Sequence, residues 1–314
     1  MKKYIVTGGA GFIGSNLVKD LVKTSEVIVI DSLVGGGLNN LSDVIDKITF
    51  IESSSGDISD LPEIKGIDGI FHLGTTASSI FFRDNPLLTG IATSDFISLL
   101  ELAKRENCKL IYASTSSIYN GNEIPYKETQ DVYVKDFYSE VRYFFERMSL
   151  LYHNLYNVRS IGLRFFSVYG PSEKNKGNLA NLVSQFLWSM QKDESPTVWE
   201  QGTQERDFVY VGDVIDSMKL SMNSNIECDV FNVGNGKSYS LNELVSILNK
   251  LLNKNLSTNF IENPLKGRAY YAQYHLADTT KAKDILGFEA KTPLEKGIEN
   301  IICCSKKDII KKIL

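Results

Sequence analysis

The sequence KKYIVTGGAGFIGSNLVKDLV, residues 2–22, decides the fold. It runs from a short apolar segment through the glycine-rich loop Thr7–Gly14 into a stretch with helical periodicity. In this loop Gly8 permits a tight turn, Gly11 lets the backbone approach a ligand, and Gly14 lets helix and strand pack closely. The stretch therefore predicts the first strand–turn–helix unit of a dinucleotide-binding fold.

The residues around this loop indicate which dinucleotide binds. Phe12 and Ile13 open the helix, where free amides and the positive end of the helix dipole attract phosphates. Asp31 ends the second apolar run, so its carboxylate can accept hydrogen bonds from the adenosine ribose. The following loop, Leu33–Asn40, contains no lysine or arginine that could neutralise a 2′-phosphate. We therefore predict NAD rather than NADP as the cofactor.

Short apolar runs and helical stretches alternate along the first part of the chain. Strands separated by helices indicate right-handed crossovers and a parallel sheet covered on both faces, the α/β, doubly wound Rossmann type. We expect strands at Lys3–Val6, Val27–Ile30, Ile48–Glu52, Gly69–Leu73 and Lys109–Ser114, and helices at Phe12–Val22, Asn85–Arg105 and Tyr138–Leu155. Asp57 and Ile58 follow the third strand, where they could bind the adenine, although a solvated loop acid explains Asp57 nearly as well.

The rest of the chain changes character, with longer loops and fewer apolar runs. We predict a dinucleotide-binding domain formed by residues 1–167 and about 207–237. A smaller, mostly C-terminal α/β substrate domain would contain about 168–206 and 238–314. Two later strands are expected to return to the main sheet, at Asp207–Val211 and Val230–Val233.

Composition and charge exclude several classes of protein. The 314 residues include 34 basic and 38 acidic side chains, a formal net charge of −4, which argues against a general nucleic-acid binder. No apolar run approaches the roughly 20 residues that span a bilayer. The four cysteines show no CxxC spacing, so we expect neither a disulfide framework nor a metal site. A cytoplasmic location without membrane or nucleic-acid partners is the expectation.

Several further motifs recur in one known family. They are FHLG at 71–74, YASTSSIY at 112–119, RFFSVYGP at 164–171, QERDFVYVGDV at 204–214 and ADTTKA at 277–282, together with Tyr138 and Glu146 in one helix. With the glycine loop, this pattern resembles the extended short-chain dehydrogenase/reductase family, specifically its nucleotide-sugar epimerases. The closest local resemblances are to UDP-hexose 4-epimerases and ADP-heptose 6-epimerases. The resemblance also places Leu73 and Gly74 beside the cofactor.

The resemblance implies a catalytic set. Tyr138 is similar to the base that takes the proton of a sugar hydroxyl while hydride moves to NAD⁺, and Thr115 to its hydroxyl partner. A tyrosine needs a nearby positive charge to act as a base near neutrality. The family usually supplies it with a lysine four residues later, where this chain has Arg142. Residues i and i+4 share a helix face, so the cation is placed correctly. The alternative for Tyr138 is a helix-face aromatic.

Five residues are candidates for binding the substrate. Arg206 and Arg268 resemble arginines that hold the diphosphate of UDP-hexoses, and a guanidinium can bind phosphate oxygens in a bidentate manner. Asn178, at the start of an expected helix over 179–190, could add contacts or be an N-cap. Lys176 matches a lysine of ADP-heptose 6-epimerases, or is an exposed loop lysine. Ser167 stands where the family usually has asparagine.

These features favour an NAD-dependent epimerase acting at C4 of a UDP-hexose such as UDP-glucose or UDP-galactose. The alternatives are epimerisation at C6 of an ADP-heptose and a non-catalytic NAD-binding regulatory protein. Dehydratases of the family usually carry Asp-Glu after Thr115, where this chain has Ser116-Ser117. We also expect a homodimer through a four-helix bundle, as in the family, with Phe144, Phe145, Met148 and Leu151 available for pairing.

Overall fold

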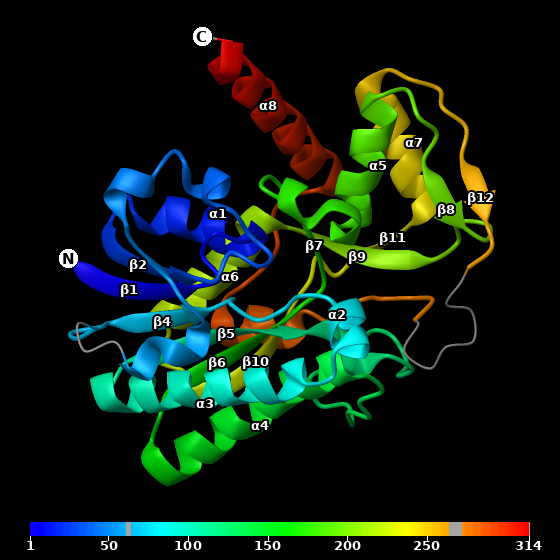
Figure 1. Ribbon diagram of the computed structural model, residues 1–314. Coiled ribbons are helices and arrows are strands. Elements are labelled where there is room, and N and C mark those ends of the chain that lie inside the picture. Colours follow the sequence, from blue (N-terminus) through cyan, green and yellow to red (C-terminus); the bar gives the residue numbers. More distant parts are fainter. Residues whose placement is uncertain (61–63, 264–271, 314) are drawn as a thin grey trace.

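A seven-stranded parallel sheet forms the centre of the computed structural model, which describes residues 1–60, 64–263 and 272–313 (Figure 1). Its strand order is β10-β6-β5-β4-β1-β2-β3, and every neighbouring pair is parallel. The strands are β1 (Lys2–Thr7), β2 (Ser25–Asp31), β3 (Thr49–Glu52), β4 (Gly69–His72), β5 (Lys109–Thr115), β6 (Ser160–Phe165) and β10 (Cys228–Val233). The order reverses at β1, which places the glycine loop at the switch point where such sheets bind ligands.

Helices cover both faces of this sheet. The helices are α1 (Phe12–Leu21) and α6 (Val211–Asn223) on one face, and α3 (Leu88–Glu106) and α4 (Phe137–Tyr156) on the other, with the short α2 (Ser79–Asp84) beside α4. Alternate residues of β1 supply the two cores. Val6 packs in the cluster with Leu17 of α1, whereas Ile5 packs in the cluster with Phe96 of α3 and Phe145 of α4. The predicted doubly wound α/β sheet is confirmed.

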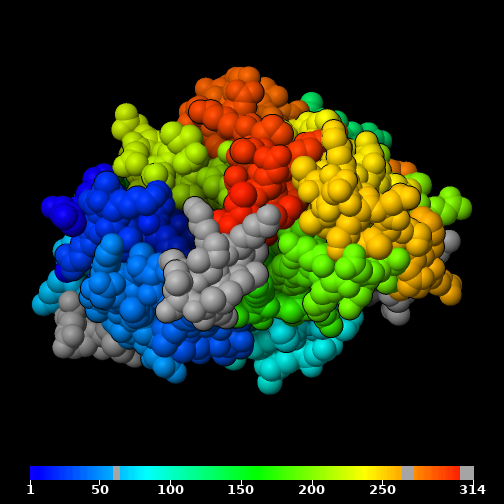
Figure 2. Space-filling model, turned by 90° about the horizontal axis from the view of Figure 1, so that it is seen from above, coloured from blue at the N-terminus to red at the C-terminus, as the bar shows by residue number. Residues whose placement is uncertain are grey.

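The second part of the chain builds smaller sheets beside the first. Strands β7 (Ser167–Tyr169), β9 (Glu205–Tyr210) and β11 (Ser238–Ser240) form one sheet, and β8 (Thr197–Trp199) pairs with β12 (Asn259–Ile261). The helices α5 (Leu182–Gln191), α7 (Leu241–Leu252) and α8 (Leu294–Ile313) accompany them. Side chains from all three helices share one core. Seen from above, the red C-terminal segments lie between the blue N-terminal part and the yellow segments around α7 (Figure 2).

One of the two predicted return strands is wrong. Residues 230–233 do join the main sheet, in β10 beside β6. The stretch 207–211 does not, because β9 pairs with β7 and β11. Asp207 is fully buried there and accepts the amides of Asn235, Gly236 and Ala277 at 2.6, 3.0 and 3.1 Å. Burial raises the pKa of Asp207 to about 6 against these hydrogen bonds. The carboxylate thus ties β9 to the loop between β10 and β11 and to the segment around Ala277.

Some of the residues that were expected to form the dimer interface are buried within the chain instead. Phe145 is fully buried and stacks on Phe96, with ring centroids 4.1 Å apart, so it belongs to the core of its own chain. Phe144 and Met148 are partly buried against the same core. Apart from Phe137 at its start, the large apolar side chains that α4 exposes lie nearer its end, where Leu151 is 46% and Leu155 67% exposed. No helix within the described part of the chain is both long and apolar enough to cross a membrane.

Candidate active site

The glycine loop forms a cradle that side chains would fill. Gly8 has a φ of +68°, which favours glycine, and a Cβ there would lie 2.5 Å from the carbonyl carbon of Leu73. A Cβ on Gly14 would overlap the Gly8 carbonyl oxygen. The first helical hydrogen bond of α1 runs from the Ser15 amide to the Gly11 carbonyl, at 3.0 Å. The amides of Phe12 and Ile13 precede that bond and face the cradle, so the loop fits a diphosphate.

Asp31 lies where the adenosine half of a dinucleotide would rest. It ends β2 and is buried, and its two carboxylate oxygens accept the amides of Ala10 and Leu33, each at 2.8 Å. Gly37 crosses the glycine loop, with its amide 3.1 Å from the Ala10 carbonyl. A carboxylate can accept about four hydrogen bonds, so Asp31 retains acceptor capacity for ribose hydroxyls.

The expected adenine contacts differ in their surroundings. Asp57 is exposed, and its carboxylate accepts the Ser53 hydroxyl at 2.9 Å. The Ile58 side chain is fully buried in the core on the α3 face, so only its backbone remains to meet a ligand. Leu73 and Gly74 lie directly against Gly8, because a Cβ on Gly8 would come 2.6 Å from the Gly74 nitrogen. The structure therefore brings Leu73 and Gly74 to the cradle, as expected.

The three catalytic candidates belong to β5 and to α4, which packs against it. Thr115 ends β5, and its hydroxyl accepts the Ser117 amide at 3.2 Å. Tyr138 lies in the first turn of α4, a helix that begins where the Asp136 carboxylate caps the Ser139 amide at 2.8 Å. Arg142 follows one turn later, with its guanidinium carbon 5.3 Å from the centroid of the Tyr138 ring. The cation therefore sits beside the phenol.

Arg142 is held in place by backbone carbonyls. The side chain is buried, and its guanidinium donates to the carbonyls of Ala113 at 3.1 Å and Thr76 at 3.4 Å. Burial lowers the pKa of Arg142 while the neighbouring Tyr138 opposes that shift, and a guanidinium keeps its charge in proteins. Its Nε is buried and has no hydrogen-bond partner among the described residues. This orphaned donor and the cradle fit a bound dinucleotide that supplies oxygen acceptors.

A buried polar network, which sequence reasoning missed, fixes α4 against the sheet. The Glu146 carboxylate accepts Arg164 Nε and Nη2 at 2.9 and 2.6 Å and the Ser114 hydroxyl at 2.5 Å. Tyr119 accepts Arg164 Nη1 and donates to Asn232 Oδ1 at 2.9 Å. Burial opposes the charge of Arg164, but the paired carboxylate outweighs it and raises the pKa. Since Ser114 precedes Thr115 and Glu146 follows Tyr138 by two turns, the network holds both in register.

The substrate candidates are less closely grouped. Ser167 is partly buried in β7. Lys176 pairs with Glu173 at 3.0 Å, and its ammonium lies 5.3 Å from the centroid of the Phe12 ring, beside the cofactor loop. Arg206 donates to the carbonyls of Glu205 and Gln273 at 2.7 and 3.1 Å. Arg268 lies outside the described residues.

The expected role of Asn178 at a helix start is wrong. Asn178 is exposed in a short turn, and α5 begins at Leu182. Asn181 is the actual N-cap, and its side chain accepts the Val183 amide at 3.0 Å. The Gly177 backbone, with φ of 51°, kinks this turn just before Asn178. Asn178 can still meet a ligand from the turn, but not through the helix end.

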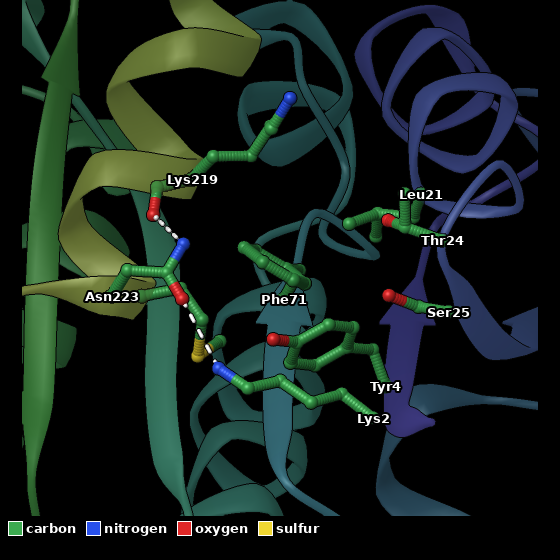
Figure 3. Close-up of a pocket in the computed structure, with 9 residues that line it drawn as sticks. Lys2, Tyr4, Leu21, Thr24, Ser25, Phe71, Lys219 and Asn223 are labelled. Carbon is green, nitrogen blue, oxygen red and sulfur yellow. Dashed lines mark hydrogen bonds between the residues drawn. The ribbon is translucent and has the colours of Figure 1, made fainter.

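A partly open pocket lies away from this site. It has a volume of about 270 Å³ and is lined from β1 and α6 by residues that include Lys2, Tyr4, Lys219 and Asn223 (Figure 3). Lys2 donates to the Asn223 side chain at 3.2 Å across it. Lys2 begins β1, so the cavity opens at the amino ends of the strands. The candidate catalytic groups lie at the opposite edge, and the cavity takes no part in the site.

The fold and the cradle define an NAD-binding enzyme of the extended short-chain dehydrogenase/reductase type. The chain belongs to the NAD dependent epimerase/dehydratase family, whose model matches residues 4–234. Its cofactor is accordingly NAD, in agreement with the position of Asp31.

Known relatives modify nucleotide sugars. UDP-glucuronic acid decarboxylase 5 from Arabidopsis thaliana is 31% identical, over 94% of this chain and 87% of that protein. A putative UDP-glucose 4-epimerase from Methanocaldococcus jannaschii is 30% identical, over 95% and 96%. The structure of UDP-glucose 4-epimerase from Thermotoga maritima with UDP-glucose has a TM-score of 0.89 at 29% identity, over 98% and 99% of the two chains. The chain is thus similar to both epimerases and decarboxylases of nucleotide sugars.

Proposed function

We propose that this protein epimerises C4 of a UDP-hexose of the UDP-glucose and UDP-galactose type. The observation that carries the proposal is the pairing of Tyr138 with the buried cation of Arg142 at the carboxyl edge of the sheet, 5.3 Å from ring centroid to guanidinium carbon. Thr115 lies at the same edge of the sheet, at the end of β5. The similarity to UDP-glucose 4-epimerases supports the choice of sugar.

The residues of this chain would handle the proton and the position of the sugar. Arg142 stabilises the phenolate form of Tyr138, which takes the proton of the C4 hydroxyl and becomes a neutral phenol. Thr115 offers a hydroxyl that hydrogen-bonds to the same sugar oxygen. NAD, held by the glycine loop and Asp31, would supply a hydride acceptor for the oxidation of C4 and a hydride donor for the opposite face of the resulting ketone. Tyr138 then gives the proton back to the C4 oxygen, which becomes the new hydroxyl.

The residues after Thr115 argue against dehydration as the main reaction. Removing water from the sugar requires an additional acid and base, and carboxylates are the usual groups for that work. This chain has Ser116 and Ser117 at these positions, and both belong to the short helical turn after β5. Neither hydroxyl can serve as a strong acid or base near neutrality.

Decarboxylation of a UDP-glucuronic acid is the second candidate, favoured by the similarity to UDP-glucuronic acid decarboxylase 5. It begins with the same oxidation at C4, because a ketone there makes the C5 carboxylate a β-keto acid that loses carbon dioxide. The proton-handling residues are then the same. The difference lies in the substrate that the site accepts.

A substrate panel distinguishes these functions. The protein with NAD⁺ is incubated separately with UDP-glucose, UDP-glucuronic acid and an ADP-heptose, and products are resolved by proton NMR. The proposal expects UDP-galactose from UDP-glucose. UDP-xylose from UDP-glucuronic acid as the only product would instead establish the decarboxylase. Turnover of the ADP-heptose alone would establish a C6 epimerase, and no turnover of any sugar would favour a regulatory NAD-binding protein.

We also propose that two chains associate through α3 and α4. The two helices pack side by side on one face of the sheet and expose apolar side chains, which include Ile91, Ile97, Leu151 and Leu155. A helix that flanks a sheet needs only one apolar stripe for its own core. A second apolar surface on the same pair of helices fits a twin pair about a two-fold axis.

A further inference from the structure

A pair of asparagines joins two segments that are far apart in the sequence. The Asn175 side-chain amide donates to Asn39 Oδ1 at 3.0 Å, and the Asn39 amide donates back to Asn175 Oδ1 at 3.4 Å. Asn39 lies in the short turn Leu38–Leu41 after β2, and Asn175 lies in the turn Lys174–Leu179 after β7. This pair, the clasp, therefore connects a segment of the main sheet to a segment of the smaller sheets.

The clasp lies beside the glycine loop. On the β2 side, the Gly37 amide donates to the Ala10 carbonyl at 3.1 Å, and a Cβ on Gly37 would lie 2.7 Å from Asn175 Nδ2. On the β7 side, the Lys176 ammonium lies 5.3 Å from the centroid of the Phe12 ring. The two segments therefore meet next to the loop whose amides fit the diphosphate.

The β2 side of the clasp is fixed to the glycine loop. The buried Asn40 donates from its side chain to the Ala10 carbonyl at 3.0 Å. A Cβ on Gly36 would lie 2.6 Å from the Ala10 carbonyl carbon and 2.8 Å from the Gly11 nitrogen, so the backbone packs directly on the loop there. This side therefore provides a fixed surface against which the other side closes.

The β7 side is anchored at its ends and exposed between them. At its base the buried Glu173 carboxylate accepts the Asn181 amide at 2.8 Å and the Ser184 hydroxyl at 2.5 Å. Between these anchors Asn175 is exposed, and a Cβ built on Gly177 would meet no atom of the described residues within 4 Å beyond its chain neighbours. Glycine is conformationally permissive, and water can replace the hydrogen bonds of an exposed amide at little cost. This turn can therefore move away from the glycine loop while its base stays in place.

We propose that the clasp of Asn39 and Asn175 is a gate for NAD, which must open before the dinucleotide enters or leaves the glycine loop. The inference rests on NAD as the cofactor and not on the sugar, so it holds equally for an epimerase and a decarboxylase. A gate differs from a direct contact with the cofactor in its kinetics. Weakening a gate speeds entry and exit together and changes the affinity little, whereas removing a contact speeds exit alone.

Stopped-flow fluorescence of NADH measures both rates without any sugar. Mixing the protein with NADH gives the association rate, and displacing bound NADH with excess NAD⁺ gives the dissociation rate. Asn39→Ala and Asn175→Ala should each speed both rates about fivefold, the value of roughly one net hydrogen bond, and leave the dissociation constant within about twofold of the parent. The matched control is Asn223→Ala, which removes an exposed amide bonded to Lys2 and to the Lys219 carbonyl at the opposite edge of the sheet (Figure 3). Its rates should equal those of the parent.

A double variant separates one shared gate from two independent effects. Because both substitutions break the same pair of hydrogen bonds, combining Asn39→Ala with Asn175→Ala should speed NADH exchange no more than either change alone. Effects that multiply to about twenty-fivefold in the double variant would overturn the proposal. A faster dissociation with unchanged association would make the asparagines direct cofactor contacts and would overturn it too, as would parent-like rates in all three variants. Circular dichroism and thermal melts confirm that each variant is folded.

Discussion

Replacing His72 by glutamine should remove part of the acid sensitivity of this protein. The pKa of His72 falls from 6.5 to about 3 in the folded chain, because burial and then the Arg142 charge disfavour the imidazolium. In the unfolded chain His72 is therefore protonated below about pH 6.5, whereas in the folded chain it stays neutral down to about pH 3. The stability that depends on neutral His72 is complete above pH 6.5 and is lost as the pH falls from 6.5 towards 3.

The expected magnitude follows from that pH interval. Between pH 6.5 and pH 5 only the unfolded chain binds a proton at His72, which lowers the free energy of unfolding by about 2 kcal/mol, at about 1.4 kcal/mol per pH unit. Urea unfolding of the parent and of His72→Gln, followed by tryptophan fluorescence at pH 7.5 and pH 5, measures it. The parent should lose about 2 kcal/mol more than the variant between the two conditions. Equal losses would show that His72 takes up its proton normally in the folded state and would refute the reasoning.

Three further predictions concern catalysis, cofactor choice and assembly. Arg142→Lys should retain measurable turnover because the charge beside Tyr138 remains. Arg142→Met should lose about a hundredfold in rate, and its activity should reach its maximum at a higher pH. An unchanged rate and pH profile for Arg142→Met would exclude this role for the arginine. Asp31→Ala should weaken the binding of NAD⁺ about tenfold in calorimetric titrations and that of NADP⁺ much less, since the carboxylate repels a 2′-phosphate. Equal losses of affinity for the two cofactors would contradict the role of Asp31 in selecting NAD. Sedimentation should show a dimer of the parent at micromolar concentration and a monomer when Leu151 and Leu155 are both changed to glutamate, and a monomeric parent would end the four-helix-bundle proposal.

Local patterns could be predicted from the sequence, and long-range pairing could not. The glycine loop and Asp31 act through contacts close in the chain or between adjacent parallel strands, so their spacing alone placed them correctly. The stretch at Asp207 is apolar and buried like a strand of the main sheet, and the sequence around it does not indicate that it pairs with β7 and β11. Likewise the bidentate pair of Glu146 and Arg164 joins a helix to a strand, a contact that only the packed fold reveals.

The central claim, epimerisation at C4, is tested most directly by following the hydrogen atom on C4 of the substrate into the product. UDP-glucose deuterated at C4 is incubated with the protein and NAD⁺, and the product is examined by NMR and mass spectrometry, with Tyr138→Phe as the inactive control. The account predicts UDP-galactose that keeps deuterium at C4, because the hydride leaves one face of the same carbon and returns to the other, and no product from Tyr138→Phe. Deuterium found at C6 or lost to solvent, or full activity of Tyr138→Phe, would contradict it.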